Sequence, residues 1–402
     1  MAHRLLLDIL RRYADLAAST LWPPRAGCAR RTLRHYATGS ALLAGLPLLL
    51  AYHWTGLLLD ELLFPGYRRV RVERPVFVLG VPRSGTTAVH HALASDARWT
   101  TFSTLECLFA LSVTWRRAWW TLARIDRALG RPGGRLADRL ERRLARALDG
   151  IHPVRREAPE EDYLAFLPVL ACFILVVPFP DARSVWRLGR FDAVLGRAER
   201  ERLMRFHRRC VQRHLHFHGT QRRFLSKNAA FAPLAGSLLE TYPDARILCC
   251  LREPGSAVSS QLAALEPALR GLHGAYRRGV FRDRMLELLG FYYRNLLDHA
   301  ARLPGRAVVI PAGALRADLA GTLIAACRAL QLAVTPESAR ALRRAATAQG
   351  AARRARHSLA QQGLSEVMVN ARLGDVSARV DFGATGPLAA NAAAPQRAAR
   401  TG

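Results

Sequence analysis

The segment Val76–Thr87, which reads Val-Phe-Val-Leu-Gly-Val-Pro-Arg-Ser-Gly-Thr-Thr, constrains the fold more than any other part of the chain. Its first residues, Val76–Leu79, form a short apolar, β-branched run that is typical of a buried parallel strand. Gly80 and Gly85 then have the spacing of a phosphate-binding loop, and a helix is expected to begin within Ser84–Thr87. Glycine lets the backbone approach a phosphate, and the exposed amides of a helix N-terminus point at it. The segment therefore predicts an α/β fold with a P-loop-type phosphate cradle.

The residues inside this loop narrow the kind of anion that it holds. A nucleoside-triphosphatase loop needs a lysine directly after the second glycine to hold the β and γ phosphates, and Thr86 stands at that place. Arg83 offers a planar guanidinium donor to a single phosphate or sulfate group. We therefore favour a loop for one such group; the alternative is a strand-to-helix turn that binds nothing.

The rest of the chain predicts a parallel sheet flanked by helices, because apolar runs alternate with helical patterns. Further strands are expected at three of these runs: 224–226, 245–251 and 307–310. The stretch from about 116 to 218 is long, amphipathic and helical in pattern, which indicates an insertion. We expect three regions: a basic, hydrophobic helical segment at 1–66, the α/β domain at 67–382, and a disordered tail at 383–402.

The N-terminal region contains a run without formal charge, from Ala41 to Leu59, that is long enough for a marginal membrane span. Pro47 and His53 interrupt it, acidic residues follow at once, and arginines flank both sides. A signal peptide is disfavoured because the run starts late and no small-residue cleavage pattern follows. We favour a helix that packs on the domain or dips into a membrane surface, with membrane contact through 41–63. A true span is the alternative.

The formal net charge of +29 does not by itself indicate a nucleic-acid partner. Of the 60 basic residues only Lys227 is a lysine, and the arginines are spread through every segment. This bias indicates that the nucleotide composition of the coding sequence set the choice of arginine over the whole chain, so no nucleic-acid partner is expected. The positive charge still suits an anionic substrate or cofactor. The seven cysteines lack metal-ligand spacing and indicate buried thiols in a reducing, cytoplasmic compartment.

Two segments carry a family resemblance. Residues 75–87 resemble the 5′-phosphosulfate loop of sulfotransferases that use 3′-phosphoadenylyl sulfate (PAPS), above all a bacterial group whose loop reads Pro-Arg-Ser-Gly-Thr-Thr. Residues 242–260 are similar to that family's 3′-phosphate site, a strand that ends in Arg-x-Pro with a serine eight residues after the arginine. The resemblance implies that PAPS is the co-substrate and that these residues bind it: Pro82, Arg83, Ser84, Gly85, Thr86, Thr87, Arg252 and Ser260.

The resemblance also implies the reaction, which moves a sulfuryl group from PAPS to a hydroxyl or amine acceptor. In-line transfer needs positioned reactants, neutralised charge and a base near the acceptor. Arg83 and Lys227 are expected to stabilise the transferring group. Glu106 occupies a position similar to that of the catalytic glutamate in relatives, and its apolar neighbours are expected to raise its pKa towards neutrality. A helix-capping or ion-paired carboxylate is the equally weighted alternative for Glu106.

Other residues compete for the role of base. In the family a lysine like Lys227 is often followed closely by a histidine, which is a familiar base. Asn228 follows here, so Glu106 is favoured as the general base. His152 precedes an acidic stretch at 157–162, for which a structural ion-pair network is favoured over acceptor binding. His90, on the helix after the loop, is more typical of packing than of chemistry.

Two other functions stay open at this stage. A nucleotide kinase-like enzyme of the same fold would need a loop lysine and a magnesium carboxylate, which the sequence does not offer. The second is a non-catalytic, membrane-associated nucleotide-binding protein. No metal is expected, and the apolar surroundings of the insertion favour a small-molecule or lipid-like acceptor.

Overall fold

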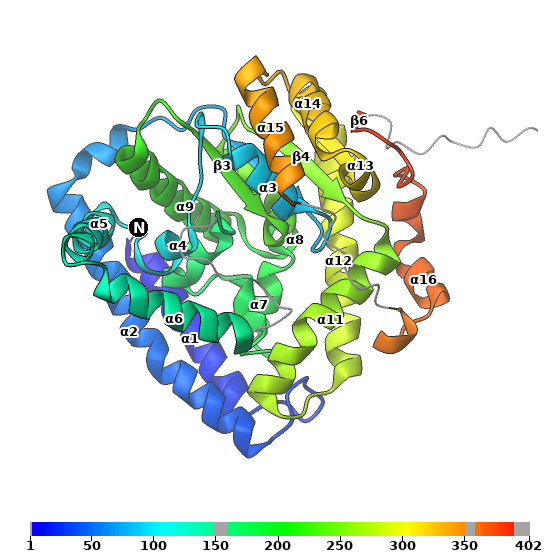
Figure 1. Ribbon diagram of the computed structural model, residues 1–402. Helices are drawn as coiled ribbons and strands as arrows, with labels where there is room; N and C mark the ends of the chain where they lie inside the picture. The colour runs from blue at the N-terminus through cyan, green and yellow to red at the C-terminus, as the bar shows by residue number, and fades with distance from the viewer. Residues whose placement is uncertain (1, 148–158, 350–357, 390–402) are drawn as a thin grey trace, which may run out of the picture. The chain divides into compact units, whose positions relative to one another are not determined.

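The computed structural model describes residues 2–147, 159–349 and 358–389 (Figure 1). The chain forms two compact units, each made of three stretches of sequence. Unit 1 comprises Met1–Glu73, Thr100–Ser226 and Ala264–Phe281; unit 2 comprises Arg74–Trp99, Lys227–Ala263 and Arg282–Gly402. The N-terminal segment and the helical insertion, which the sequence analysis treats as separate regions, therefore belong to one unit.

Unit 2 contains the parallel sheet that the sequence predicts. Strand β4 (Arg246–Leu251) lies between β1 (Val76–Gly80) and β5 (Ala307–Pro311) and is parallel to both. Apart from Arg246, every residue of these three strands is buried, which is typical of a parallel sheet covered on both faces. The fold class is therefore confirmed as α/β with a parallel sheet flanked by helices.

Helices follow the strands of unit 2 as expected. Helix α3 (Thr86–Ala94) begins directly after the loop that leaves β1, and it packs against α15 (Pro336–Gln349). Figure 1 shows α14 (Leu319–Ala329) alongside α15. The other helical segments of this unit are η4 (Ala229–Leu234), α10 (Ala235–Thr241), α13 (Ala312–Ala317), η5 (Ala360–Gln362) and α16 (Glu366–Ser377).

The predicted tail begins with an ordered strand. β6 (Leu388–Ala389) pairs antiparallel with β5, through Val309 opposite Leu388. The expectation of disorder from residue 383 is therefore wrong for Leu388 and Ala389. Their strand is formed by pairing with β5, which the Ala/Gly/Pro-rich local sequence does not reveal. Residues 390–402 lie outside the described residues.

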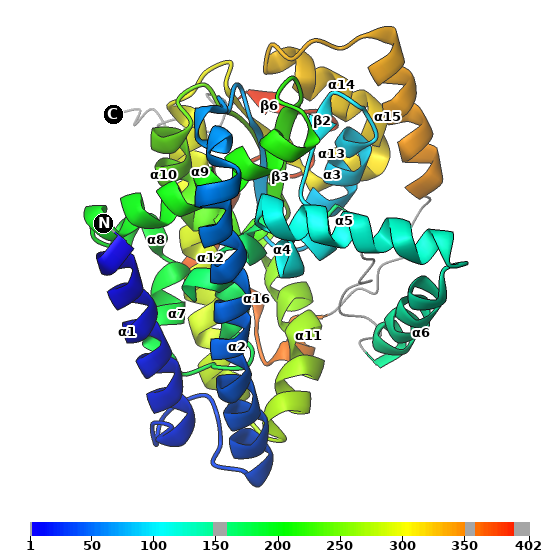
Figure 2. The ribbon, with the colours of Figure 1, turned by 90° about the vertical axis from the view of Figure 1, so that its left-hand side faces the viewer.

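Unit 1 is mostly helical as far as it is described. Its N-terminal part consists of α1 (Ala2–Leu21), α2 (Leu33–Leu63) and η1 (Pro65–Arg69); α1 and α2 lie side by side (Figure 2). The remainder comprises α4 (Thr104–Phe109), α5 (Val113–Ala128), α6 (Pro132–Ala147), η2 (Asp162–Val169), η3 (Phe173–Val176), α7 (Arg183–Leu188), α8 (Phe191–Val194) and α9 (Arg197–His218).

Four elements lie where the chain passes from one unit to the other. They are β2 (Trp99–Thr100), β3 (Arg223–Asn228), α11 (Pro254–His273) and α12 (Arg278–Ala301). The last two residues of β3, Lys227 and Asn228, already belong to unit 2.

Helix α2 contains the uncharged run and, by length and composition, is long and apolar enough to cross a membrane. Of its most apolar stretch, 28% is buried in the protein. Its C-terminal end is anchored in unit 1 by a buried charge. The Asp60 carboxylate accepts hydrogen bonds of 2.8 Å from the backbone amides of Val113 and Thr114, which caps α5, and it pairs with Arg213 at 2.8 Å. One face of α2 thus packs on protein while the other exposes leucines, Leu48 at 74% and Leu62 at 79%.

Candidate active site

The backbone is tightly packed at Gly80, where the predicted phosphate loop leaves β1. A Cβ atom added to Gly80 would lie 2.3 Å from the carbonyl oxygen of Cys250 on the neighbouring strand, closer than any van der Waals contact. The Val81 amide donates a hydrogen bond of 3.3 Å to the same oxygen. Glycine at position 80 is therefore required by the sheet itself, before any ligand is considered.

The loop owes its shape to two left-handed residues. Gly85 has φ +94° and precedes the first residue of α3, whereas Arg83 reaches φ +68° without the freedom of glycine. The Ser84 hydroxyl donates to the carbonyl of Val81 at 2.7 Å and is fully buried. A non-glycine residue at positive φ costs free energy and is typical of functional loops. Of the predicted binding residues, three are buried, Ser84, Thr86 and Ser260, and five are half-buried: Pro82, Arg83, Gly85, Thr87 and Arg252.

The predicted 3′-phosphate residues meet the loop. Arg252 directly follows β4, and Ser260 lies on α11, 7% exposed. The Nε of Arg83 donates to the Oγ of Ser260 at 3.3 Å, and an Nη of Arg252 donates to the backbone oxygen of Arg83 at 3.4 Å. Two sequence motifs that were predicted separately thus converge at the carboxyl ends of two adjacent parallel strands, where open α/β sheets bind ligands.

The acidic neighbours of Arg252 are engaged elsewhere. The Glu253 carboxylate accepts hydrogen bonds from the amides of Gly255 and Ser256, at 2.8 and 2.7 Å, and so caps α11. The Asp244 carboxylate accepts from the Arg74 amide at 2.7 Å. Both carboxylates thus hold backbone amides of unit 2.

Lys227 lies at the end of β3 and is 2% exposed. Its positive charge, together with the larger effect of burial, holds the pKa of His90 on α3 well below the usual value. His90 is completely buried, which agrees with its interpretation as a packed residue.

Glu106 lies in unit 1, on α4, and is held by its own helix. Its carboxylate accepts from the Ser103 amide at 2.9 Å, and the Ser103 hydroxyl accepts from the Glu106 amide at 3.3 Å, which together form a capping box. The other carboxylate oxygen pairs with the Nε of Arg116 at 2.8 Å. Glu106 therefore has the helix-capping and ion-pair contacts that were the alternative to a catalytic role. These contacts do not exclude that role.

Two histidines of α9 complete the surroundings of Glu106. The carboxylate lies 2.6 Å from Nε2 of His218 and 3.5 Å from Nδ1 of His214. Burial alone would raise the pKa of Glu106, but Arg116 and the two histidines outweigh it and hold that pKa well below its usual range. The predicted rise in the pKa of Glu106 is therefore wrong, because the buried guanidinium of Arg116 lies beside the carboxylate together with the apolar neighbours. Burial lowers the pKa of His214 to about 4.

Sequence reasoning missed these partners, although a signal exists. His214 and His218 are four residues apart on a helix, which places both side chains on one face. In the part of the chain that the structure describes, Glu106, His214 and His218 are also the one group with metal-ligand atoms this close, within 4.8 Å of one another. The guanidinium of Arg116 already neutralises the carboxylate, so an ion-pair network fits these residues better than a cation site.

The acidic stretch after His152 belongs to a structural network as far as it is described. Glu160 accepts from the Thr104 hydroxyl at 2.9 Å. Asp162 accepts from the Ser226 hydroxyl at 2.8 Å and lies 3.1 Å from His207. His152 itself, like 157 and 158, lies outside the described residues.

Comparison with known proteins agrees with the geometry of unit 2. A family model described as "Sulfotransferase family" matches residues 75–336, which include the loop, Lys227, Arg252 and Ser260. The chain belongs to the sulfotransferase family. Membership supports sulfuryl transfer as its reaction. No curated protein matches the chain in sequence.

Two solved sulfotransferases share the fold over nearly the whole chain. Sulfotransferase STF9 from Mycobacterium avium is 16% identical, with a TM-score of 0.73 over 96% of this chain and 98% of its own. Sulfotransferase STF1 from Mycobacterium tuberculosis H37Rv is 19% identical, with a TM-score of 0.66 over 90% of this chain and 91% of its own. The sulfotransferase fold thus extends beyond the matched family segment.

Proposed function

We propose that this sulfotransferase takes the sulfuryl group from PAPS and transfers it in line to a hydroxyl or amine acceptor. The observation that carries the proposal is the convergence of Arg83, Arg252 and Ser260 beside a loop that has Thr86 in place of lysine. A lysine-free cradle suits one sulfate-bearing phosphate, and the arginine–serine pair suits a second phosphate on the same nucleotide.

In the proposed reaction, loop residues 82–87 hold the 5′-phosphosulfate with backbone amides and hydroxyls, while Arg252 and Ser260 hold the 3′-phosphate. The acceptor oxygen forms a bond to sulfur as the bond between sulfur and the 5′-phosphate oxygen breaks. Arg83 and Lys227 stabilise the charge that spreads over the transferring group and the leaving phosphate. No metal is required, because these side chains supply the positive charge.

Glu106 is proposed to accept the proton that the acceptor loses. Its low pKa keeps it deprotonated at neutral pH, which is the form that a general base needs, but it also makes the carboxylate a weak base. Nε2 of His218 lies 2.6 Å away and donates a hydrogen bond to this carboxylate, which orients it, while the proton taken from the acceptor stays on Glu106. Glu106 is thus proposed to act together with His218.

Titration calorimetry with 3′,5′-adenosine bisphosphate and with ATP tests the donor assignment. We expect the bisphosphate to bind more tightly, since the loop has no lysine for a triphosphate. Tighter binding of ATP would overturn the proposal. Transfer of labelled sulfate from PAPS to lipid and aqueous cell extracts, assayed separately, identifies the acceptor class, for which a small or lipid-like alcohol is proposed.

The proposed location is cytoplasmic, with surface contact to a membrane through 41–63. All seven cysteines are free and buried, as expected for thiols in a reducing compartment. The exposed leucines of α2 provide the apolar face for the membrane contact.

A further inference from the structure

Unit 1 contains a cavity whose lining residues all belong to that unit. It has a volume of about 320 Å³ and is lined by residues of α1, α2 and α9. This volume falls at the lower end of the range of about 300–1,000 Å³ that is usual for small-molecule sites. Neither the family's donor motifs nor the proposed base contributes to its lining.

One wall of the cavity is a row of arginines on α9. Residues 202, 205, 209 and 213 recur every three or four positions, so that all four side chains lie on one face of the helix. A single carboxylate, that of Glu61, lines the cavity with them. The wall is therefore strongly positive where it meets the empty volume.

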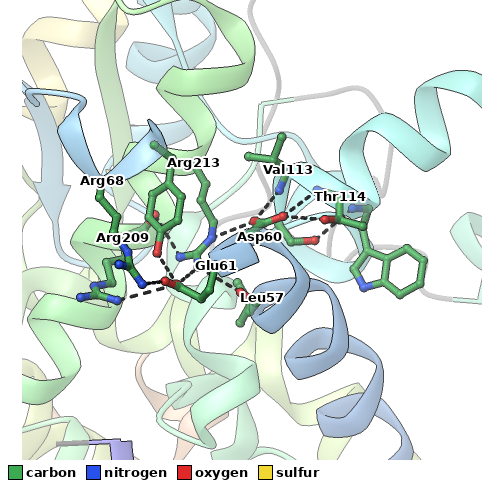
Figure 3. Close-up of polar contacts among 11 residues, drawn as sticks. Leu57, Asp60, Glu61, Arg68, Val113, Thr114, Arg209 and Arg213 are labelled. Atoms are coloured by element: carbon green, nitrogen blue, oxygen red, sulfur yellow. Dashed lines mark hydrogen bonds and ion pairs between the residues drawn. The ribbon is translucent and has the colours of Figure 1, made fainter. Parts of the chain in front are cut away.

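Nearby acidic residues compensate this charge only in part. Asp8 pairs with Arg202 at 2.7 Å, and Asp60 pairs with Arg213 at 2.8 Å. Glu61 is shared, as Figure 3 shows: Arg213 lies 2.7 Å from it, Arg209 3.8 Å, and Arg68 contacts it as well. Because three arginines share one glutamate, the cavity can accept an added negative charge.

The rest of the lining is apolar, apart from Glu61. The rings of Trp54 on α2 and Phe206 on α9 lie with their centroids 6.1 Å apart, and Leu58 lines the cavity although it is 59% exposed. A small inorganic anion would leave this apolar part of the lining uncovered, whereas a neutral chain would not use the excess positive charge around Glu61. The lining as a whole matches a molecule with a charged end and a hydrocarbon end.

We propose that this cavity binds a single-chain amphiphile with an anionic headgroup, carboxylate, phosphate or sulfate, with the headgroup on the arginine row and the chain against Trp54 and Phe206. The inference does not rest on the proposed sulfuryl transfer, since no donor or base residue lines the cavity.

Calorimetric titration of the full-length chain with dodecyl phosphate, kept below its micelle concentration, tests the proposal. Inorganic phosphate and dodecanol are titrated as headgroup-only and chain-only probes, and each is expected to bind at least about tenfold more weakly. Binding of 3′,5′-adenosine bisphosphate should leave the affinity for dodecyl phosphate unchanged, because the donor residues belong to unit 2.

Two variants with matched controls locate the site. Arg209→Gln is expected to weaken dodecyl phosphate binding about tenfold, since a charge-assisted contact is lost. Its control, Arg197→Gln, changes an arginine of the same helix that pairs with Glu201 and does not line the cavity. Leu58→Ser should also weaken binding, whereas Leu62→Ser, on the same helix but outside the lining, should not.

Three results would overturn the proposal. They are equal affinities for Arg209→Gln and Arg197→Gln, equal binding of inorganic phosphate and dodecyl phosphate, and displacement of dodecyl phosphate by the bisphosphate. The altered side chains of Arg209 and Leu58 are largely exposed, so both variants are expected to fold; circular dichroism verifies this before titration.

Discussion

The Nε of Arg83 donates a hydrogen bond to the Oγ of Ser260 across 3.3 Å, although 177 residues separate them in the chain. Arg83 comes from the loop after β1, and Ser260 comes from the helix after β4, the strand that pairs with β1 in parallel register. The contact makes one site of two motifs. The proposed donor, a nucleotide with phosphates at both its 3′ and 5′ positions, would contact both motifs.

Replacing Ser260 tests this coupling. Ser260→Ala is expected to weaken binding of 3′,5′-adenosine bisphosphate about tenfold, because a hydroxyl donor to a charged group is lost. The neighbouring Ser259 is the control, since its hydroxyl donates to the carbonyl of Ser256 within the helix. Calorimetry on both variants decides the matter, and equal affinities would remove Ser260 from the binding site.

Gly80 supplies a test of the loop that is independent of any ligand. Gly80→Ala should destabilise the chain by about 3 kcal/mol, because the added Cβ meets the Cys250 carbonyl at 2.3 Å and backbone cannot move aside cheaply. Gly374→Ala on α16 is the control, since a Cβ there meets nothing within 4 Å. Urea denaturation measures both, and a variant at position 80 as stable as the parent would contradict this account of the loop.

The sequence predicted the central sheet well because its strands depend on local pattern. The apolar run at 76–79 became β1, and the run at 245–251 became β4, each within one residue at either end. Such strands are buried on both faces and read as continuous apolar runs, so the neighbouring residues alone specify them. β6 was not predicted, because its two residues form a strand only through hydrogen-bonded pairing with β5, which is distant in sequence.

The environment of Glu106 could not be predicted in the same way. The apolar residues next to it in sequence suggested a raised pKa, but Arg116 and His218 reach it from two other helices. A pKa depends on charges in space, and sequence neighbours report only part of them. The same holds for Lys227, whose charge acts on His90 of α3 although 137 positions separate them in the sequence.

Lys227 is expected to be intolerant even of arginine. The side chain is 2% exposed, so a larger guanidinium does not fit, while methionine matches the volume without the charge. Both Lys227→Arg and Lys227→Met should lower kcat for sulfuryl transfer, Lys227→Met by about a hundredfold to a thousandfold. Single-turnover assays with labelled PAPS measure the loss. A fully active Lys227→Met enzyme would exclude the lysine from charge stabilisation.

Glu106→Gln should alter both activity and the pH dependence of stability. The folded-state pKa of Glu106 lies below its ordinary value of 4.5, so the carboxylate stabilises the fold fully above pH 4.5 and loses this effect as the pH falls through the folded-state pKa. Removing its charge leaves Arg116 buried without its counter-ion, at a cost of about 3 kcal/mol at pH 7.

The stability difference between the parent and Glu106→Gln should therefore stay constant from pH 7 to about 5 and shrink at lower pH. Chemical denaturation across this range measures it, with the solvent-exposed Glu337→Gln as a control that should behave like the parent. A difference that grows as the pH falls would mean that Glu106 has a raised pKa after all. Loss of transfer at unchanged bisphosphate affinity would separate a role as base from a merely structural one.

The exposed face of α2 gives the last prediction, which concerns membrane contact. Leu48 lies within 41–63 and is 74% exposed, whereas Leu33, on the same helix but outside that stretch, is 87% exposed. If the stretch touches a membrane, Leu48→Gln should weaken binding to vesicles of mixed phosphatidylglycerol and phosphatidylcholine about thirtyfold, because burial of a leucine side chain contributes about 2 kcal/mol. Leu33→Gln should leave vesicle binding unchanged. Cosedimentation in high salt removes the contribution of the basic surface, and equal behaviour of the two variants there would show that apolar contact through 41–63 does not hold the chain on the membrane.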